Sequence, residues 1–208
     1  MKATEILSIQ HPDAISIAKK IIQKNGTIAF PTDTIYGLAA HAFSPAGIQK
    51  IYRAKQRPTD KALPVLIGNL QQLPLLTSSI SKNALAIASA FWPGALTLLL
   101  PKSAALPLDL TPYPTIGIRM PDYAFTLKLL NETGPLATTS ANISGGLNPV
   151  NAREVLDQLD GRVDLILDGG QTLGGTASTV IDASGYQLKV LRQGPISLDD
   201  VHALFNQE

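Results

Sequence analysis

The chain has 208 residues, of which 45% are hydrophobic, and its 17 basic and 16 acidic residues give a formal net charge of +1. This length allows one substantial core, and the near-neutral charge excludes a global field that would draw the protein onto nucleic acid or an anionic membrane. The absence of cysteine excludes disulfides and thiolate chemistry, and His11, His41 and His202 are too scattered for a metal triad.

The apolar segments of the chain bear on its localisation. The N-terminal stretch MKATEILSIQHPD lacks the apolar core of a signal peptide. The longest strongly apolar run, ALTLLL at 95–100, is far too short to span a bilayer. The sequence therefore predicts a cytoplasmic protein that has no membrane partner.

Helices alternate with short apolar strands in the first half of the chain. Ile15, Ala18 and Ile22 recur at helical spacing before Gly26, and Ser44-Pro45 is a typical helix start. We expect strands at 27–32 and 63–68, a loop at 33–43, and helices at 13–25, from 44 toward residue 52, at 70–76 and at 81–91.

The second half contains more strands than helices. Asn151 and Glu154 have the spacing of a capping box, and Ser197 is a typical N-cap residue for a final helix. We expect strands at 96–101, 115–121, 135–141, 163–168, 178–183 and 188–193, and helices at 122–131, at 151–159 and from 197. No repeat or flexible linker divides the chain, so the pattern predicts one α/β domain with at least seven strands in a twisted sheet.

Several familiar catalytic motifs are absent. No glycine is followed by lysine, which excludes a P-loop, and no two glycines have the spacing that begins a dinucleotide-binding G-x-G-x-x-G motif. No serine has the flanking glycines of the nucleophile elbow of serine hydrolases.

Polar loops and one basic segment suggest an anion site instead. Loops at 31–40, 138–149, 168–179 and 192–195 each follow an apolar, strand-like segment, where α/β sheets bind ligands. The segment RAKQRPTDKALP holds Arg53, Lys55, Arg57 and Lys61. The loops could be ordinary turns and the basic segment a solvated face, but together they favour a shared site for a polyanion.

These segments resemble a known family. In order, PTDTIYGLAA, IYRAKQRPTDKALPVLI, FWPGALTLLL, TIGIRMPD, TTSANISG, VDLILDGG and STVIDASG followed by LRQGP are similar to the blocks of the YrdC-type L-threonylcarbamoyl-AMP synthases. The resemblance covers about residues 10 to 200. It implies a single YrdC-like domain over residues 1–208 without a C-terminal second domain, built as an open twisted mixed sheet with flanking helices and a concave electropositive cavity.

The resemblance also implies a nucleotidyl transfer reaction. L-threonine, bicarbonate or CO2, and ATP would give threonylcarbamoyl-AMP and pyrophosphate, with Mg2+ entering with ATP and no metal ligands supplied by the protein. Proteins that transfer the threonylcarbamoyl group to tRNA would be the downstream partners, and the cavity rim could bind RNA weakly. No general base is evident, so catalysis is expected to depend on positioning.

The same matching implies roles for twelve residues. Lys55 and Arg57 would be catalytic, and Arg53 a solvated charge. The ATP contacts would be Lys55, Arg57, Lys61, Thr115, Ser140, Asn142, Asn148 and Arg192. The L-threonine contacts would be Thr34, Arg119, Thr138 and Ser178. Removing Lys55 or Arg57, taken as surface charges, is expected to change stability by no more than about 0.5 kcal/mol.

One departure and two alternatives qualify the resemblance. Many relatives carry histidine where this chain has Leu66, and that histidine helps to hold threonine. A carbamoyl-adenylate-forming enzyme would share the nucleotide site but not the threonine pocket. A binding module for double-stranded RNA would use the basic rim, although the near-neutral charge argues against this as the main role.

Overall fold

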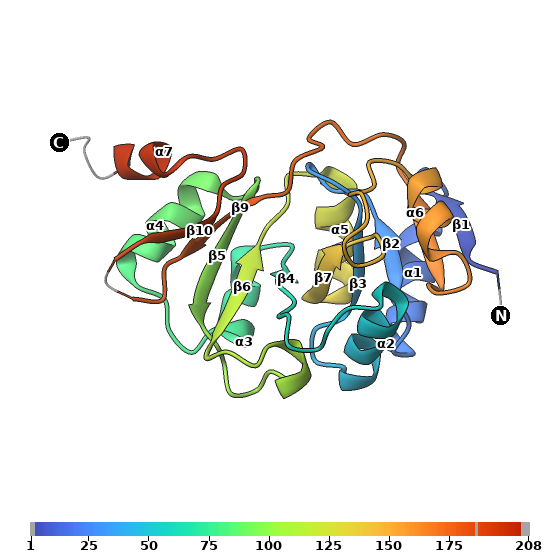
Figure 1. Cartoon of the computed structure of the whole chain (residues 1–208), viewed down its shortest axis with the longest axis horizontal. Coiled ribbons are helices and arrows are strands. Elements are labelled where there is room, and N and C mark those ends of the chain that lie inside the picture. Colours follow the sequence, from blue (N-terminus) through green and yellow to red (C-terminus); the bar gives the residue numbers. More distant parts are fainter. Residues whose placement is uncertain (1–2, 186, 205–208) are drawn as a thin grey trace.

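One mixed sheet runs through the computed structural model, which describes residues 3–185 and 187–204 (Figure 1). Within these residues the sheet has ten strands in the order β1-β8-β2-β3-β7-β4-β6-β5-β9-β10. The strands are β1 (Glu5–Ser8), β2 (Ile28–Phe30), β3 (Gly37–His41), β4 (Val65–Leu66), β5 (Leu96–Pro101), β6 (Thr115–Arg119), β7 (Leu136–Ser140), β8 (Leu165–Asp168), β9 (Thr179–Asp182) and β10 (Lys189–Arg192).

The pairing of the strands brings distant parts of the chain together. β8 is parallel to both β1 and β2, β4 is parallel to β6, and β5 is parallel to β9. The other neighbours are antiparallel, including β3 with β7 and β5 with β6. The polar segments that follow β2 and β7 in the sequence therefore lie near the middle of one sheet.

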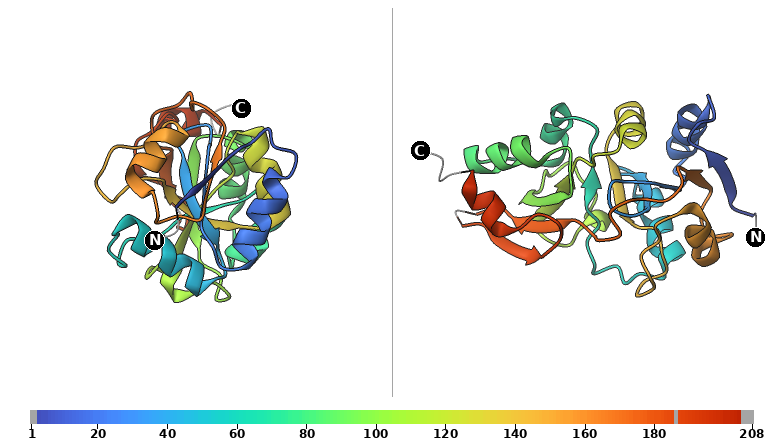
Figure 2. Two further views of the ribbon diagram at one scale, coloured as in Figure 1. Left: turned by 90° about the vertical axis from the view of Figure 1, so that its right-hand side faces the viewer. Right: turned by 90° about the horizontal axis from the view of Figure 1, so that it is seen from above.

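Helices cover both faces of the sheet. They are α1 (Ala14–Gln23), α2 (Pro45–Lys55), α3 (Leu73–Leu76), α4 (Lys82–Phe91), α5 (Ala124–Thr133), α6 (Ala152–Leu159) and α7 (Leu198–Ala203), with short 3-10 turns at Leu70–Gln72 and Leu108–Leu110. Figure 2 shows α1 and α5 on one side and α2 and α6 on the other. Within the described residues, none of these helices has the length and apolar character needed to cross a bilayer.

Strand alternation explains the two-sided core. Ile28 and Phe30 of β2 pack with α1 and α5, whereas Ala29 between them belongs to the cluster that includes α2 and α6. The same alternation holds in β8, where Leu165 and Leu167 pack on the side of α1 and α5 and Ile166 belongs to the cluster that includes α2 and α6. Side chains on a strand point alternately to opposite faces, so short apolar segments such as LILD can bury both faces at once.

The expected α/β sheet and its flanking helices are confirmed, and the eight predicted strands correspond to β2 and β4–β10. Two strands were missed. The expected loop at 33–43 is wrong, because β3 lies inside it between β2 and β7. Its sequence GLAAH lacks the β-branched and aromatic residues typical of strands, and the fully buried position selects its small side chains. The edge strand β1 pairs only with β8 among the described strands, and most of it is exposed.

Candidate functional site

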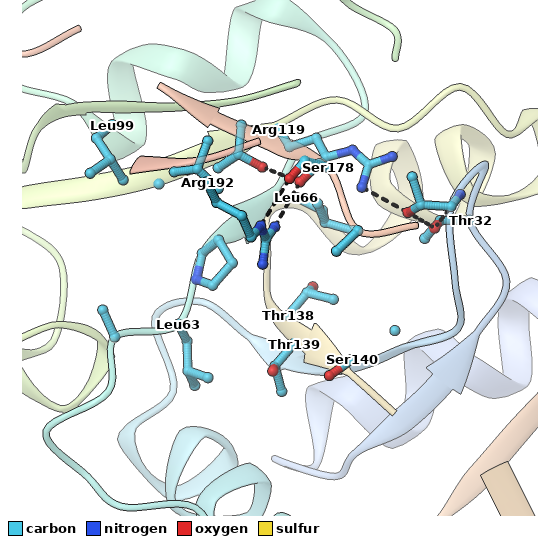
Figure 3. Close-up of a pocket in the computed structure, with 18 of the residues that line it drawn as sticks. Thr32, Leu63, Leu66, Leu99, Arg119, Thr138, Thr139, Ser140, Ser178 and Arg192 are labelled. Carbon is cyan, nitrogen blue, oxygen red and sulfur yellow. Dashed lines mark hydrogen bonds between the residues drawn. The ribbon is translucent and has the colours of Figure 1, made fainter. Parts of the chain in front are cut away.

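A cavity of about 400 Å3 lies at the middle of the sheet, a size typical of small-molecule sites (Figure 3). Strand alternation forms part of its wall. Thr115, Gly117 and Arg119 of β6 line the cavity, while Ile116 and Ile118 between them pack in the core. The rest of the lining comes from β3, β4, β5, β7, β9 and β10, from the loops after β2, α2, β7 and β8, and from the segment before β6.

Most of the side chains that the sequence assigned to a site lie around this one cavity. Its lining includes Thr34, Arg57, Thr115, Arg119, Thr138, Ser140, Asn148, Ser178 and Arg192. Lys55, Lys61 and Asn142 do not belong to the lining. The structure thus joins the predicted threonine contacts to most of the predicted ATP contacts, while the role of each residue stays a prediction.

The cavity combines positive charge with many hydroxyl groups. Arg57, Arg119 and Arg192 line it, and none of the described residues in its wall is acidic. Hydroxyl groups come from Thr32, Thr34, Thr97, Thr111, Tyr113, Thr115, Thr138, Thr139, Ser140 and Ser178. This composition suits an anionic ligand that also accepts or donates hydrogen bonds, while the electropositive character of the cavity stays a prediction.

Arg119 is held on three sides. Its Nη2 lies 2.5 Å from Asp33 Oδ1, Nη1 donates to Thr34 Oγ1 at 2.9 Å, and Nε donates to the carbonyl of Gly94 at 2.9 Å. Burial lowers the pKa of Arg119, against the opposing effect of the Asp33 charge, but a guanidinium remains protonated in proteins. Leu66 lies beside Arg119 in the β4–β6 register and lines the cavity, so this part of the wall is apolar.

The hydroxyl proton of Thr34 has a defined direction. Thr32 Oγ1 donates to the carbonyl of Ile35 at 2.7 Å, and it lies 2.9 Å from Thr34 Oγ1. Since a hydroxyl has one proton, Thr34 must be the donor in the Thr32–Thr34 pair. Thr34 also accepts from Arg119, which leaves its oxygen one further lone pair, able to accept from the amino group of a ligand.

A second guanidinium lies at Ser178. Arg192 Nε donates to the Ser178 carbonyl at 3.0 Å and Nη2 donates to Ser178 Oγ at 3.2 Å, as Figure 3 shows. Ser178 Oγ also lies 2.8 Å from Thr97 Oγ1. Burial, followed by the positive charge of Arg119, lowers the pKa of Arg192. The two guanidinium groups are therefore close enough to repel each other, and an anion between them would relieve that repulsion.

Lys55 is buried beneath the cavity, although it was predicted to contact a phosphate. Its side chain is 1% exposed, and Nζ donates to the carbonyls of Ser140 and Asn142 at 2.5 and 2.6 Å and to Asn142 Oδ1 at 3.0 Å. Burial, followed by the charge of Arg57, lowers the pKa of Lys55 to about 7, whereas the three oxygen acceptors favour the ammonium form. All three protons of the ammonium are used within the protein, so treating Lys55 as a surface charge is wrong.

Asn142 is fixed by the same network. Its Oδ1 accepts from Lys55 and from Ser140 Oγ at 2.6 Å, and its Nδ2 donates to the carbonyl of Gly146 at 2.6 Å. Ser140 lines the cavity, but its proton points away from the cavity toward Asn142. In this arrangement Ser140 presents lone pairs to a ligand, and Lys55 and Asn142 set the position of the end of β7 that carries it.

A backbone turn at Gln56 places the basic side chains of the segment RAKQRPTDKALP in different surroundings. Gln56 ends α2 in the left-handed conformation, with φ 52°. Before this turn Lys55 is buried, and after it Arg57 lines the cavity and donates to the carbonyls of Lys61 and Ala62. Arg53 is exposed, as expected, and the Lys61 residue is exposed as well.

Sequence reasoning missed several residues of this site. Thr32, Thr97 and Thr139 line the cavity, and Asp33 pairs with Arg119 from outside the lining. The signal for Thr97 was a polar residue in the otherwise apolar strand LTLLLP. Asp33 lies in the quoted segment PTDT, but an acidic side chain is not expected at a site that binds anions, because like charges repel.

The sequence and fold of the chain match those of a known protein family. Residues 20–194 match the Sua5/YciO/YrdC family, which carries the description "Telomere recombination". The chain belongs to this family. It is 41% identical to the threonylcarbamoyl-AMP synthase of Bacillus subtilis over 97% of its length and 38% identical to that of Pyrococcus abyssi over 93%. The resemblance found in the sequence blocks is thereby confirmed.

The members of the Sua5/YciO/YrdC family differ in length. The chain spans 59% of the B. subtilis relative and 57% of the P. abyssi relative. It spans 89% of a putative threonylcarbamoyl-AMP synthase of Mycobacterium tuberculosis, to which it is 36% identical over 92% of its own length. P. abyssi Sua5, solved in complex with L-threonine, superposes on 92% of this chain and 57% of its own with a TM-score of 0.89 at 39% identity.

Proposed function

We propose that the chain forms L-threonylcarbamoyl-AMP and pyrophosphate from L-threonine, bicarbonate or CO2, and ATP. Family membership supports this, because the B. subtilis and P. abyssi relatives are named threonylcarbamoyl-AMP synthases and P. abyssi Sua5 binds L-threonine. The M. tuberculosis relative, similar in length to this chain, carries the same name as a putative function.

The observation that carries the proposal is that one cavity contains two sets of anion-binding groups. Arg119 with Thr34 can take the carboxylate and amine of an amino acid. Arg57 and Arg192, with the neighbouring hydroxyl groups, can take the phosphates of a nucleotide. An enzyme that joins an amino acid to a nucleotide needs both sets in one enclosed space.

The reaction needs two bond-forming steps. The amine of L-threonine attacks CO2 to give a carbamate and a proton, and a carbamate oxygen then attacks the α-phosphorus of ATP as pyrophosphate leaves. No histidine, lysine or carboxylate lies among the described residues that line the cavity. We therefore expect the chain to act by holding the reactants in line and by stabilising phosphate charge with its guanidinium groups.

Mg2+ is expected to arrive with ATP. Within residues 3–185 and 187–204, no group of three or more histidine, aspartate or glutamate side chains could hold a metal ion. The hydroxyl-rich wall fits a magnesium ion that keeps its waters and binds phosphate oxygens. When bound it would neutralise phosphate charge. We further propose that the reaction takes place in the cytoplasm and that the product passes to proteins that modify tRNA.

Mass spectrometry of the reaction mixture tests this function. The protein is incubated with ATP, Mg2+, 13C-labelled bicarbonate and L-threonine, and we expect labelled threonylcarbamoyl-AMP together with pyrophosphate. Equally fast pyrophosphate release without L-threonine, or a requirement for carbamoyl phosphate, would instead support a carbamoyl-adenylate-forming enzyme. Tight, salt-sensitive binding of double-stranded RNA without nucleotide turnover would support the RNA-binding alternative.

A further inference from the structure

Asp33 forms an ion pair with Arg119 from behind the cavity wall. The two side chains are only 17% and 7% exposed, and Asp33 itself is not part of the cavity lining. A carboxylate next to an anion site weakens the attraction for the ligand, so electrostatic attraction does not explain its presence. Its position relative to the Arg119 donors suggests another role.

The donors of Arg119 can be counted. A guanidinium has five N–H groups, and three of them donate to Asp33, Thr34 and Gly94. Because Nε is occupied by the Gly94 carbonyl, the two remaining N–H groups are one on Nη1 and one on Nη2. These two nitrogens form the end-on fork that binds both oxygens of a carboxylate.

The segment that carries Asp33 is itself fixed. The amide of Gly175 donates to the carbonyl of Thr34 at 2.9 Å, and Gly174 packs so closely that an added Cβ would lie 2.6 Å from the Asp33 carbonyl. Asp33 therefore provides a fixed point of attachment. After burial, the positive charge of Arg119 is the cause that lowers the pKa of Arg192. By pairing with Arg119, the Asp33 carboxylate also counters the repulsion between the two guanidinium groups.

We propose that Asp33 is a positioning residue that holds the Arg119 guanidinium so that its free Nη1 and Nη2 donors receive the carboxylate of the amino-acid substrate. The identity of that substrate as L-threonine rests on the proposed function. Asp33 does not touch the substrate, and its effect is transmitted entirely through Arg119.

Kinetics of Asp33→Ala and Asp33→Asn test this role. Pyrophosphate release is measured against L-threonine at saturating ATP and against ATP at saturating L-threonine. We expect Asp33→Ala to raise KM for L-threonine about tenfold or more, as loss of a hydrogen bond to a charged group implies, and to leave KM for ATP nearly unchanged. Asp33→Asn keeps an acceptor and should lose less. In an Arg119→Lys background Asp33→Ala should add almost nothing, because the fork is already gone.

A second measurement is independent of the substrate. Rotation of the Arg119 Nη groups, followed by NMR of the ligand-free protein, should be slow in the wild type and faster in Asp33→Ala. Glu132→Ala, which removes the exposed ion pair with Lys19, serves as the matched control and should change neither measurement. Unchanged rotation, or equal rises in both KM values, would overturn the proposal. If the wild type does not use L-threonine, the proposed function fails, and the rotation measurement alone decides whether Asp33 positions Arg119.

Discussion

Lys55 and Arg57 are two positions apart in the sequence, yet the structure gives them different surroundings. The Lys55 ammonium is enclosed by three oxygens of Ser140 and Asn142, at the end of β7 and in the loop after it, whereas Arg57 lines the cavity. The resemblance to the family implied that both would contact a phosphate. The direction of each side chain depends on the left-handed turn at Gln56, which no residue type in the segment indicates.

Burial of Lys55 predicts a stability effect in place of the negligible change expected for a surface charge. Lys55→Met should lower the free energy of unfolding by about 2–4 kcal/mol, because three buried oxygen acceptors lose their donor. Denaturant unfolding monitored by circular dichroism measures the change. Arg53→Met, at an exposed position of the same helix, is the matched control and should stay within about 0.5 kcal/mol. An unchanged stability with a large loss of ATP affinity would show that Lys55 acts on the nucleotide.

At the scale of elements, the sequence predicted those strands and helix starts that depend only on the pattern of neighbouring residues. The apolar strand LTLLLP and the cap at Ser44 were placed correctly, because strand alternation and capping are readable over a few residues. β3 was not predicted, because Gly37, Ala39 and Ala40 form a strand only through pairing with β2 and β7. The loops around the cavity were recognised by their hydroxyl groups, but the ion pair of Asp33 with Arg119 joins elements 86 positions apart and needs the folded sheet.

The turn that ends α2 gives a prediction at this scale. Gln56 is exposed and adopts φ 52°, a conformation that is unfavourable for a residue with a Cβ and that glycine adopts freely. Gln56→Gly should therefore stabilise the protein by about 0.5–1 kcal/mol, after allowance for the greater entropy of glycine in the unfolded chain. Thermal unfolding measures the effect, and KM for ATP should not change. A lower midpoint would mean that the Gln56 side chain stabilises the turn in a way that its backbone conformation does not reveal.

At the scale of the whole molecule, the cavity lies where strands distant in sequence are neighbours. β5 and β6 contribute Thr97 and Arg119, β7 contributes Ser140, and β9 follows directly after Ser178. Because the ligand-binding groups come from so many strands, a bound ligand contacts the sheet across several of its pairings. Ligand binding should then be visible in the stability of the entire fold, since the unfolded chain has no such site.

We therefore predict that L-threonine and ATP with Mg2+ each raise the thermal midpoint of the wild type. At about 100 times Kd, binding adds roughly 2.7 kcal/mol, which corresponds to a shift of about 5–10 °C for a chain of this size. Arg119→Lys should abolish most of the L-threonine shift and keep the ATP shift. Arg57→Gln should do the reverse, because Arg57 lies among the predicted phosphate contacts.

Differential scanning fluorimetry measures both shifts in each variant, and only the ligand-induced change is compared, because Arg57 also donates to backbone carbonyls and its loss alters the starting midpoint. Arg53→Gln, at an exposed position outside the cavity lining, should keep both shifts. If either cavity variant lost both shifts equally, the two guanidinium groups would serve one common ligand. The division of the cavity into an amino-acid end at Arg119 and a phosphate end at Arg57 would then be wrong.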